Sequence, residues 1–203
     1  MLGYLLGTVP SADAAARLAS GGAVDLRIAG SGNPGGANAV KVLGARWGYG
    51  VMAADIAKAS LASVLGRRLA GDRGAHVAAS ASVVGHCFPV WTGFRGGKGV
   101  ACSVGQCLAT FPAFFPVDLG VAALAGTRRW RSRSHAATVA ACGAWVLGAL
   151  VWWRRGWSNG WGPAPTADLP IAAAVSSAVI LSRFAAGAGY NAEASASTMD
   201  SSR

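Results

Sequence analysis

The residues best suited to chemistry lie in one short turn of two cations among glycines. The turn FRGGKG supplies Arg95 and Lys98 beside Gly96, Gly97 and Gly99. Glycines let backbone N–H groups approach an anion closely, and the cations add charge-assisted hydrogen bonds. The GxxxxGK[ST] spacing of a P-loop and the strand that precedes it are missing, so ATP binding is not supported. The turn predicts a phosphate cradle of another kind.

A second glycine-rich stretch, SGNPGGAN, lies earlier in the chain and has a similar character. Ser31, Asn33 and Asn38 offer hydrogen-bonding side chains around Gly32, and Lys41 follows. Taken alone, this composition is also that of a flexible loop. A second loop with glycines and a lysine on the same face favours anion binding for both.

Three ionisable groups lie inside or at the end of apolar segments. Asp55 and Lys58 are three residues apart in a predicted helix, so they share a face and can pair. Ionisable groups at membrane depth are costly and usually face a polar cavity, so the pair either stabilises the fold or lines a substrate site. His86 lies near the end of the third predicted span, shortly before FRGGKG. We interpret it as a hydrogen-bonded histidine that shapes this turn, with a catalytic base as the alternative.

The composition indicates that membrane helices position these groups. The chain has 203 residues, of which 53% are hydrophobic and 13% charged, and its mean hydropathy is +0.40. A soluble domain carries about 25% charged residues. The net charge is +10, and the Lys and Arg residues lie in short clusters between apolar segments. This distribution favours loops that face anionic lipid or phosphate over a nucleic-acid-binding surface.

The apolar segments predict an all-α integral membrane protein. We expect a bundle of about seven short transmembrane helices with glycine-rich cytoplasmic loops, since most Lys and Arg residues fall on the side of those loops. We expect a membrane domain over residues 1–190 and a polar, disordered tail over 191–203. The four cysteines make no CxxC pair, and no metal or other cofactor is expected. The expected spans are 1–20, 47–66, 75–92, two within 99–126 divided near Pro112 and Pro116, 135–153 and 169–187.

Both glycine-rich stretches resemble signatures of a known family. SGNPGGAN with Lys41 and Gly44 resembles the first signature of the bacterial acyl-phosphate:glycerol-3-phosphate acyltransferases. GHCFPVWTGFRGGKGVA resembles their second signature at nearly full length. The Asp55–Lys58 pair matches a usual position between the two, and the resemblance covers about residues 3–190.

The resemblance implies an activity, a location and a set of site residues. The family transfers an acyl chain from acyl-phosphate to glycerol 3-phosphate at the cytoplasmic face of the bacterial inner membrane, giving lysophosphatidic acid for phospholipid synthesis. It implies no cofactor, and an enzyme that produces acyl-phosphate as a possible partner. Because acyl-phosphate is an activated anhydride, positioning and charge stabilisation can supply most of the rate. The implied residues are Ser31, Asn38, His86 and Lys98 in catalysis, and Gly32, Asn33, Lys41, Arg95, Gly96, Gly97, Gly99, Arg129, Ser132 and Arg183 in phosphate binding.

The chain departs from the family pattern at its first and third signatures. Lys41 stands where the family has arginine, so the charge is kept without the bidentate fork. Alignment on Arg183 places Ser177, Ile180 and Gly189 where histidine, asparagine and glutamate are expected. One alternative is therefore a weak or inactive homologue that binds phospholipid precursors or partners an active acyltransferase. A small transporter of anionic solutes is disfavoured, because the glycine signatures cluster on one face instead of at the midplane.

Overall fold

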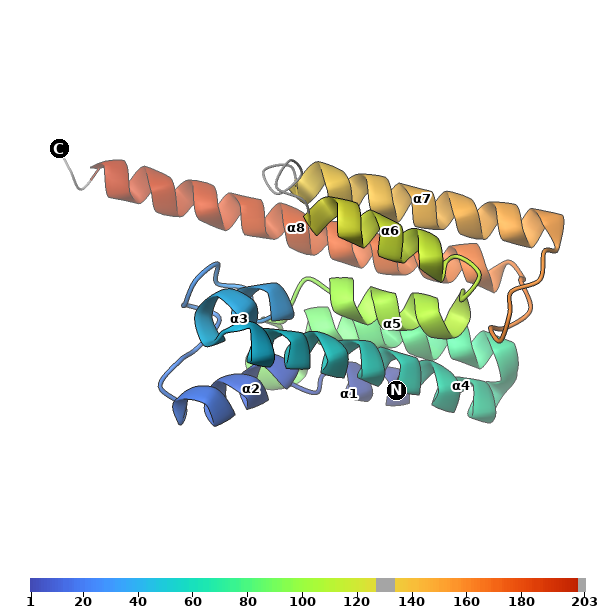
Figure 1. Cartoon of the computed structure of the whole chain (residues 1–203), viewed down its shortest axis with the longest axis horizontal. Helices are drawn as coiled ribbons and strands as arrows, with labels where there is room; N and C mark the ends of the chain where they lie inside the picture. Colours follow the sequence, from blue (N-terminus) through green and yellow to red (C-terminus); the bar gives the residue numbers. More distant parts are fainter. Residues whose placement is uncertain (127–133, 201–203) are drawn as a thin grey trace.

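The protein is a bundle of helices that run roughly side by side (Figure 1). The computed structural model describes residues 1–126 and 134–200, and within them every regular element is a helix. The all-α class expected from the sequence is confirmed. The elements are α1 (Leu2–Gly7), α2 (Ser11–Ser20), α3 (Gly36–Leu43), α4 (Ala45–Cys87), the 3₁₀ turn η1 (Val90–Thr92), α5 (Val100–Thr110), α6 (Phe115–Gly126), α7 (Ser134–Arg155) and α8 (Asp168–Asp200).

The longest element, α4, is a hairpin of two helices that lie side by side (Figure 1). Ala70 (φ −144°) and Gly71 (φ +65°) leave the helical conformation, and the chain turns back there. A side chain on Gly66 or Gly74 would overlap the other residue's backbone, so the two halves approach more closely than larger residues allow. The two consecutive spans expected on either side of this turn correspond to the two halves.

Prolines break the chain at two places. Between α5 and α6 the helix stops for residues 111–114, where Pro112 has no N–H to donate. This break is the one expected within 99–126. The expected single span over 1–20 is wrong, because α1 and α2 are separate helices. Pro10 removes another donor and disfavours the helical conformation at Val9, whose carbonyl group is left without a helical partner.

The α1 helix has only six residues and is held by close backbone packing against the second half of α4. A side chain at Gly7 would overlap the carbonyl group of Ser82, and one at Gly85 would overlap that of Tyr4. The Tyr4 hydroxyl also donates to the Phe88 carbonyl oxygen at 2.8 Å, which fixes the end of α4 beside α1.

A buried polar network joins α4, α5 and α8 at the centre of the bundle. Gln106 is fully buried; its Nε2 donates to the Ser80 hydroxyl at 3.1 Å, and its Oε1 accepts from the Ser176 hydroxyl at 2.7 Å. Each polar group of the glutamine side chain therefore has a partner on a different helix. Such a network specifies how the three helices pack.

Helix α8 extends into the segment 191–203 that was expected to be a polar tail, and the division of the chain at residue 190 stays a prediction. The helix continues to Asp200 and projects beyond the other helices (Figure 1). Residues 191–200 (NAEASASTMD) include several alanines, a glutamate and a methionine, which are strong helix formers. Among the described helices, the segment Asp168–Ala186 is long and apolar enough to cross a membrane, with a mean hydropathy of 1.7. The count of about seven spans stays a prediction.

The loops gather at two opposite ends of the bundle (Figure 1). At one end lie α2, α3 and the start of α5. At the other end the α4 turn meets the connector between α7 and α8, where Arg67 donates to the Trp161 carbonyl oxygen at 3.0 Å and the Ala164 N–H donates to Asp72 at 3.0 Å. Both glycine-rich loops belong to the first end.

The contact between α1 and α4 predicts a position-specific effect of valine. In Gly85→Val the new side chain meets the α1 backbone, and overpacking of this kind costs about 1–3 kcal/mol. In the control Gly50→Val, on the same helix, the added group meets no atom within 4 Å. We expect the thermal unfolding midpoint in detergent to fall for Gly85→Val and to stay or rise slightly for Gly50→Val. Equal midpoints for the two variants would contradict this packing.

Candidate active site

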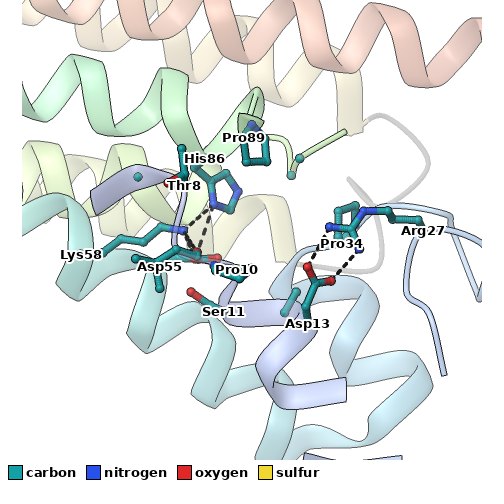
Figure 2. Close-up of a pocket in the computed structure, with 15 residues that line it drawn as sticks. Thr8, Pro10, Ser11, Asp13, Arg27, Pro34, Asp55, Lys58, His86 and Pro89 are labelled. Carbon is teal, nitrogen blue, oxygen red and sulfur yellow. Dashed lines mark hydrogen bonds and ion pairs between the residues drawn. The ribbon is translucent and has the colours of Figure 1, made fainter. Parts of the chain in front are cut away.

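A pocket opens where the α1–α2 break, α4 and the two glycine-rich loops meet (Figure 2). The break contributes Thr8 to Asp13, α4 contributes Asp55, Lys58 and His86, and the second glycine loop contributes Gly96 and Gly97. Segments far apart in the sequence therefore surround one polar space.

Lys58 is the centre of the polar cluster at the floor of this pocket. Its Nζ lies 2.9 Å from Asp55 Oδ1, 3.1 Å from His86 Nδ1 and 2.9 Å from the Val9 carbonyl oxygen (Figure 2). Asp55 is 2% exposed and Lys58 is 8% exposed. The expected pair forms, and it both joins α4 to the α1–α2 break and lines the pocket.

Three potential metal ligands also lie in this cluster. One ligand atom each from Asp55, His86 and Cys102 falls within 4.8 Å of the others. The Lys58 ammonium already bridges the carboxylate and the imidazole, and Cys102 Sγ donates to the Asp55 carbonyl oxygen at 3.4 Å. The cationic partner of this carboxylate is therefore a side chain, and the donor set does not favour a metal ion.

The second glycine loop is folded back onto the end of α4. Pro89 disfavours further helix, so the last carbonyl groups of α4 need other donors. The Gly97 N–H donates to the His86 carbonyl oxygen at 3.1 Å, and the Gly96 N–H donates to that of Cys87 at 3.2 Å. Closing the loop therefore uses both N–H groups, and the expected binding of a substrate phosphate at Gly96 and Gly97 stays a prediction.

Arg183 of α8 holds the same loop from the other side. Its Nη2 donates to the Gly96 carbonyl oxygen at 2.8 Å and its Nε to that of Gly97 at 3.3 Å. The guanidinium also lies over the Phe88 ring at 5.4 Å. These contacts show that Arg183 helps to hold the loop in shape, and its direct contact with phosphate stays a prediction.

The remaining predicted cations lie around the pocket and not among the residues that line it. Lys98 is half-buried, with Nζ 4.2 Å from the centre of the Phe184 ring. Burial, and then the charge of Arg183, lower the pKa of Lys98. Arg95 and Lys41 are exposed. Gly99 (φ +85°) begins α5 and packs closely against Cys87, a conformation and an approach that favour glycine.

The first glycine loop is organised by Asn38, which is 1% exposed. Its Oδ1 accepts from the Ser31 N–H at 2.8 Å, and its Nδ2 donates to the carbonyl oxygens of Leu26 and Ala29 at 3.1 and 2.9 Å. The substrate contact expected of Asn38 is not available while these bonds hold. The Ser31 side chain is exposed and that of Asn33 is partly exposed, whereas Gly32 adopts φ +67° at the loop turn.

Two residues of the pocket were missed by the sequence analysis. Arg27 donates to both carboxylate oxygens of Asp13, at 2.6 and 2.9 Å, and its Nε donates to the Arg95 carbonyl oxygen at 3.2 Å. The hydrogen bond that Arg27 donates to Asp13 is the main cause of the raised pKa of Arg27. This pair ties α2 to both glycine loops. The available signal was Asp13 itself, which is one of two charged residues, with Arg17, in a mainly apolar first segment.

The departures in the third signature lie in the core and not at the pocket. Ile180 is 2% exposed and packs with Val83 and Cys87 beneath Gly99. Ser177 is 5% exposed, so its hydroxyl is buried. Helix α8 turns both residues toward neighbouring helices. Arg129 and Ser132 lie outside the described residues, as does the side-chain environment of position 189.

Comparison with known proteins places this site in a family. The model of the glycerol-3-phosphate acyltransferase family matches residues 1–188, so the chain belongs to this family. The chain is 41% identical to the glycerol-3-phosphate acyltransferase of Symbiobacterium thermophilum over 133 residues, 65% of each chain. It is 42% identical to that of Exiguobacterium sibiricum over 119 residues, 59% of this chain and 57% of that one. The chain thus spans less than two thirds of these two relatives.

Two solved structures have the same fold. Both are of PlsY (YgiH), an integral membrane glycerol 3-phosphate acyltransferase. Its glycerol 3-phosphate form superposes with a TM-score of 0.70 at 28% identity, over 95% of this chain and 89% of that one. Its lysophosphatidic acid form gives a TM-score of 0.68 at 27% identity, over 90% of this chain and 84% of that one.

The contacts of Arg183 predict a local effect on the glycine loop. Arg183→Lys keeps the charge and removes the forked geometry, and one hydrogen bond to a charged group contributes about 1.5–3 kcal/mol. We expect amide hydrogen exchange at Gly96 and Gly97 to accelerate about tenfold or more. Arg154→Lys, at an exposed position in the last turn of α7, is the matched control and leaves these amides unchanged. Equal exchange in both variants would rule out this role.

Proposed function

We propose that this chain transfers an acyl group from acyl-phosphate to glycerol 3-phosphate, giving lysophosphatidic acid and inorganic phosphate. The observation that carries the proposal is the family match over residues 1–188, together with a pocket that joins both glycine signatures. The PlsY form that contains glycerol 3-phosphate, and whose fold this chain shares, supports the acceptor. The donor is supported by the resemblance of both signatures to acyl-phosphate-dependent enzymes.

The reaction needs positioning and charge more than covalent catalysis. The glycerol hydroxyl oxygen attacks the acyl carbonyl carbon and forms the ester bond, while the bond from that carbon to the phosphate oxygen breaks. Phosphate leaves with the electron pair, and the hydroxyl proton passes to phosphate or water. Both substrates are phosphate esters or anhydrides, so cations at the pocket lower the barrier by stabilising negative charge.

The chain supplies such cations in two groups. Lys58 and Arg27 line the pocket, each paired with a carboxylate. Arg95 and Lys98 lie on the second glycine loop and Lys41 lies in α3, and none of the three forms an ion pair within the described part of the chain. We assign phosphate binding to this second group, with Ser31 and Asn33 as hydrogen-bonding partners for phosphate or the glycerol hydroxyls.

We further propose that the protein is a multi-pass protein of the bacterial inner membrane whose site faces the cytoplasm. The fold shared with an integral membrane acyltransferase and the excess of cations at the glycine-loop end support this orientation. Anionic lipid is then the natural surface for the exposed cations, and an enzyme that makes acyl-phosphate is the expected supplier of the donor. The alternative, an inactive homologue, is not favoured by the family match across both glycine signatures.

Acyl transfer by the purified protein tests the proposal. We expect lysophosphatidic acid from acyl-phosphate and labelled glycerol 3-phosphate in detergent. Lys98→Ala removes a charged contact of about 1.5–3 kcal/mol, so kcat/KM falls about tenfold to more than a hundredfold. Arg68→Ala, exposed at the opposite end of the bundle, is the control and changes kcat/KM less than about twofold.

Two results would contradict the proposal. A folded native chain without product would favour the inactive homologue. Unchanged kcat/KM in Lys98→Ala would show that Lys98 does not bind a substrate phosphate.

A further inference from the structure

The hydrogen bonds of Lys58 determine which nitrogen of His86 carries the proton. An ammonium group has three N–H donors and no acceptor. Three acceptor atoms surround Lys58 Nζ, namely Asp55 Oδ1 at 2.9 Å, the Val9 carbonyl oxygen at 2.9 Å and His86 Nδ1 at 3.1 Å. The contact with Asp55 is an ion pair without hydrogen-bond geometry, whereas the ammonium donates to the Val9 carbonyl oxygen. The ammonium can donate to His86 Nδ1 only if Nδ1 carries no proton.

The alternative protonation states fit the same geometry poorly. A proton on Nδ1 would face the Lys58 ammonium at 3.1 Å, donor against donor. Its other acceptor would be Asp55 Oδ1 at 3.5 Å, which is long for a charge-assisted hydrogen bond. A doubly protonated ring would also place two cations against one buried carboxylate. The cluster therefore selects the neutral ring with its proton on Nε2.

The Nε2 atom of His86 faces the second glycine loop and the pocket. A side chain on Gly97 would overlap this atom, so glycine at that position makes room for the ring. In Figure 2 the second ring nitrogen points away from Lys58 and Asp55. Within the described residues no protein group accepts a hydrogen bond from Nε2, and His86 lines the pocket.

We propose that Lys58 fixes His86 in the Nε2–H form, and that this N–H donates a hydrogen bond to an anionic oxygen of a bound substrate instead of accepting a proton as a general base. The inference rests on the proposed function and assigns the chemistry of one residue within it. Lys58 is then a positioning residue, which acts through the tautomer of His86, and His86 is the residue that touches the substrate.

Imidazole nitrogen NMR of the native protein tests the tautomer without reference to activity. The chain has three histidines, and the signals of His86 are assigned by their loss in His86→Gln or, should that variant not fold, by elimination with His76→Gln and His135→Gln. We expect an unprotonated, pyridine-type signal for Nδ1 and a protonated, pyrrole-type signal for Nε2. Glycerol 3-phosphate or inorganic phosphate is expected to shift the Nε2 signal. A protonated Nδ1, or an Nε2 signal that neither probe shifts at saturation, would overturn the proposal.

Two substitutions of His86, compared by their acyl-transfer activity, distinguish a hydrogen-bond donor from a general base. Glutamine places an amide N–H near the position of Nε2 but cannot take up a proton, whereas leucine provides neither function. We expect His86→Gln to keep activity within about tenfold of the native value and His86→Leu to lose about a hundredfold. Equal losses in both would indicate a base and overturn the donor role. If the native chain lacks acyl transfer, the proposed function fails, while the NMR signals still decide the tautomer and the phosphate contact.

Discussion

The buried ammonium of Lys58 is the constraint on which the arrangement of the site depends. Removing a charge from water is costly unless its hydrogen bonds are all satisfied. The hydrogen-bond acceptors are the Val9 carbonyl oxygen at the α1–α2 break and His86 at the end of the hairpin, and Asp55, one turn away, forms the ion pair. The helix break at Pro10 thus has a role, because it frees the carbonyl group of Val9 to accept this bond. One side chain thereby fixes three segments of the pocket wall.

The same cluster also fixes the position of the second glycine loop. The His86 carbonyl oxygen accepts from the Gly97 N–H, while the His86 ring lies against the same glycine. Arg183 completes the attachment from α8. The loop's glycines therefore serve close packing and loop closure, and its side chains Arg95 and Lys98 remain to meet an anion. Helix α8, which departs from the family's third signature, still supplies this structural contact.

The sequence predicted those parts of the fold and site that depend on local spacing. Three-residue separation was enough to pair Asp55 with Lys58, and proline chemistry was enough to divide α5 from α6. It did not predict the Asp13–Arg27 pair, because those residues meet only after α2 and the first glycine loop have packed together. Nor could it show that Asn38, Gly96 and Gly97 use their hydrogen bonds within the loops, since a pattern identifies polar groups but not their partners. Ile180 illustrates the same limit. Helical spacing predicts on which face of the helix this residue lies, but not which residues pack against that face.

The central claim is that Asp55 and Lys58 act as one unit in which each charge requires the other. A double-mutant cycle with Asp55→Asn and Lys58→Met, followed by the free energy of unfolding in detergent, tests it most directly. Each single change leaves an unpaired buried charge and is expected to cost about 3–5 kcal/mol, whereas the double change costs far less than the sum. Additive costs would contradict the account, because the two residues would then stabilise the fold independently and Lys58 would not organise the site.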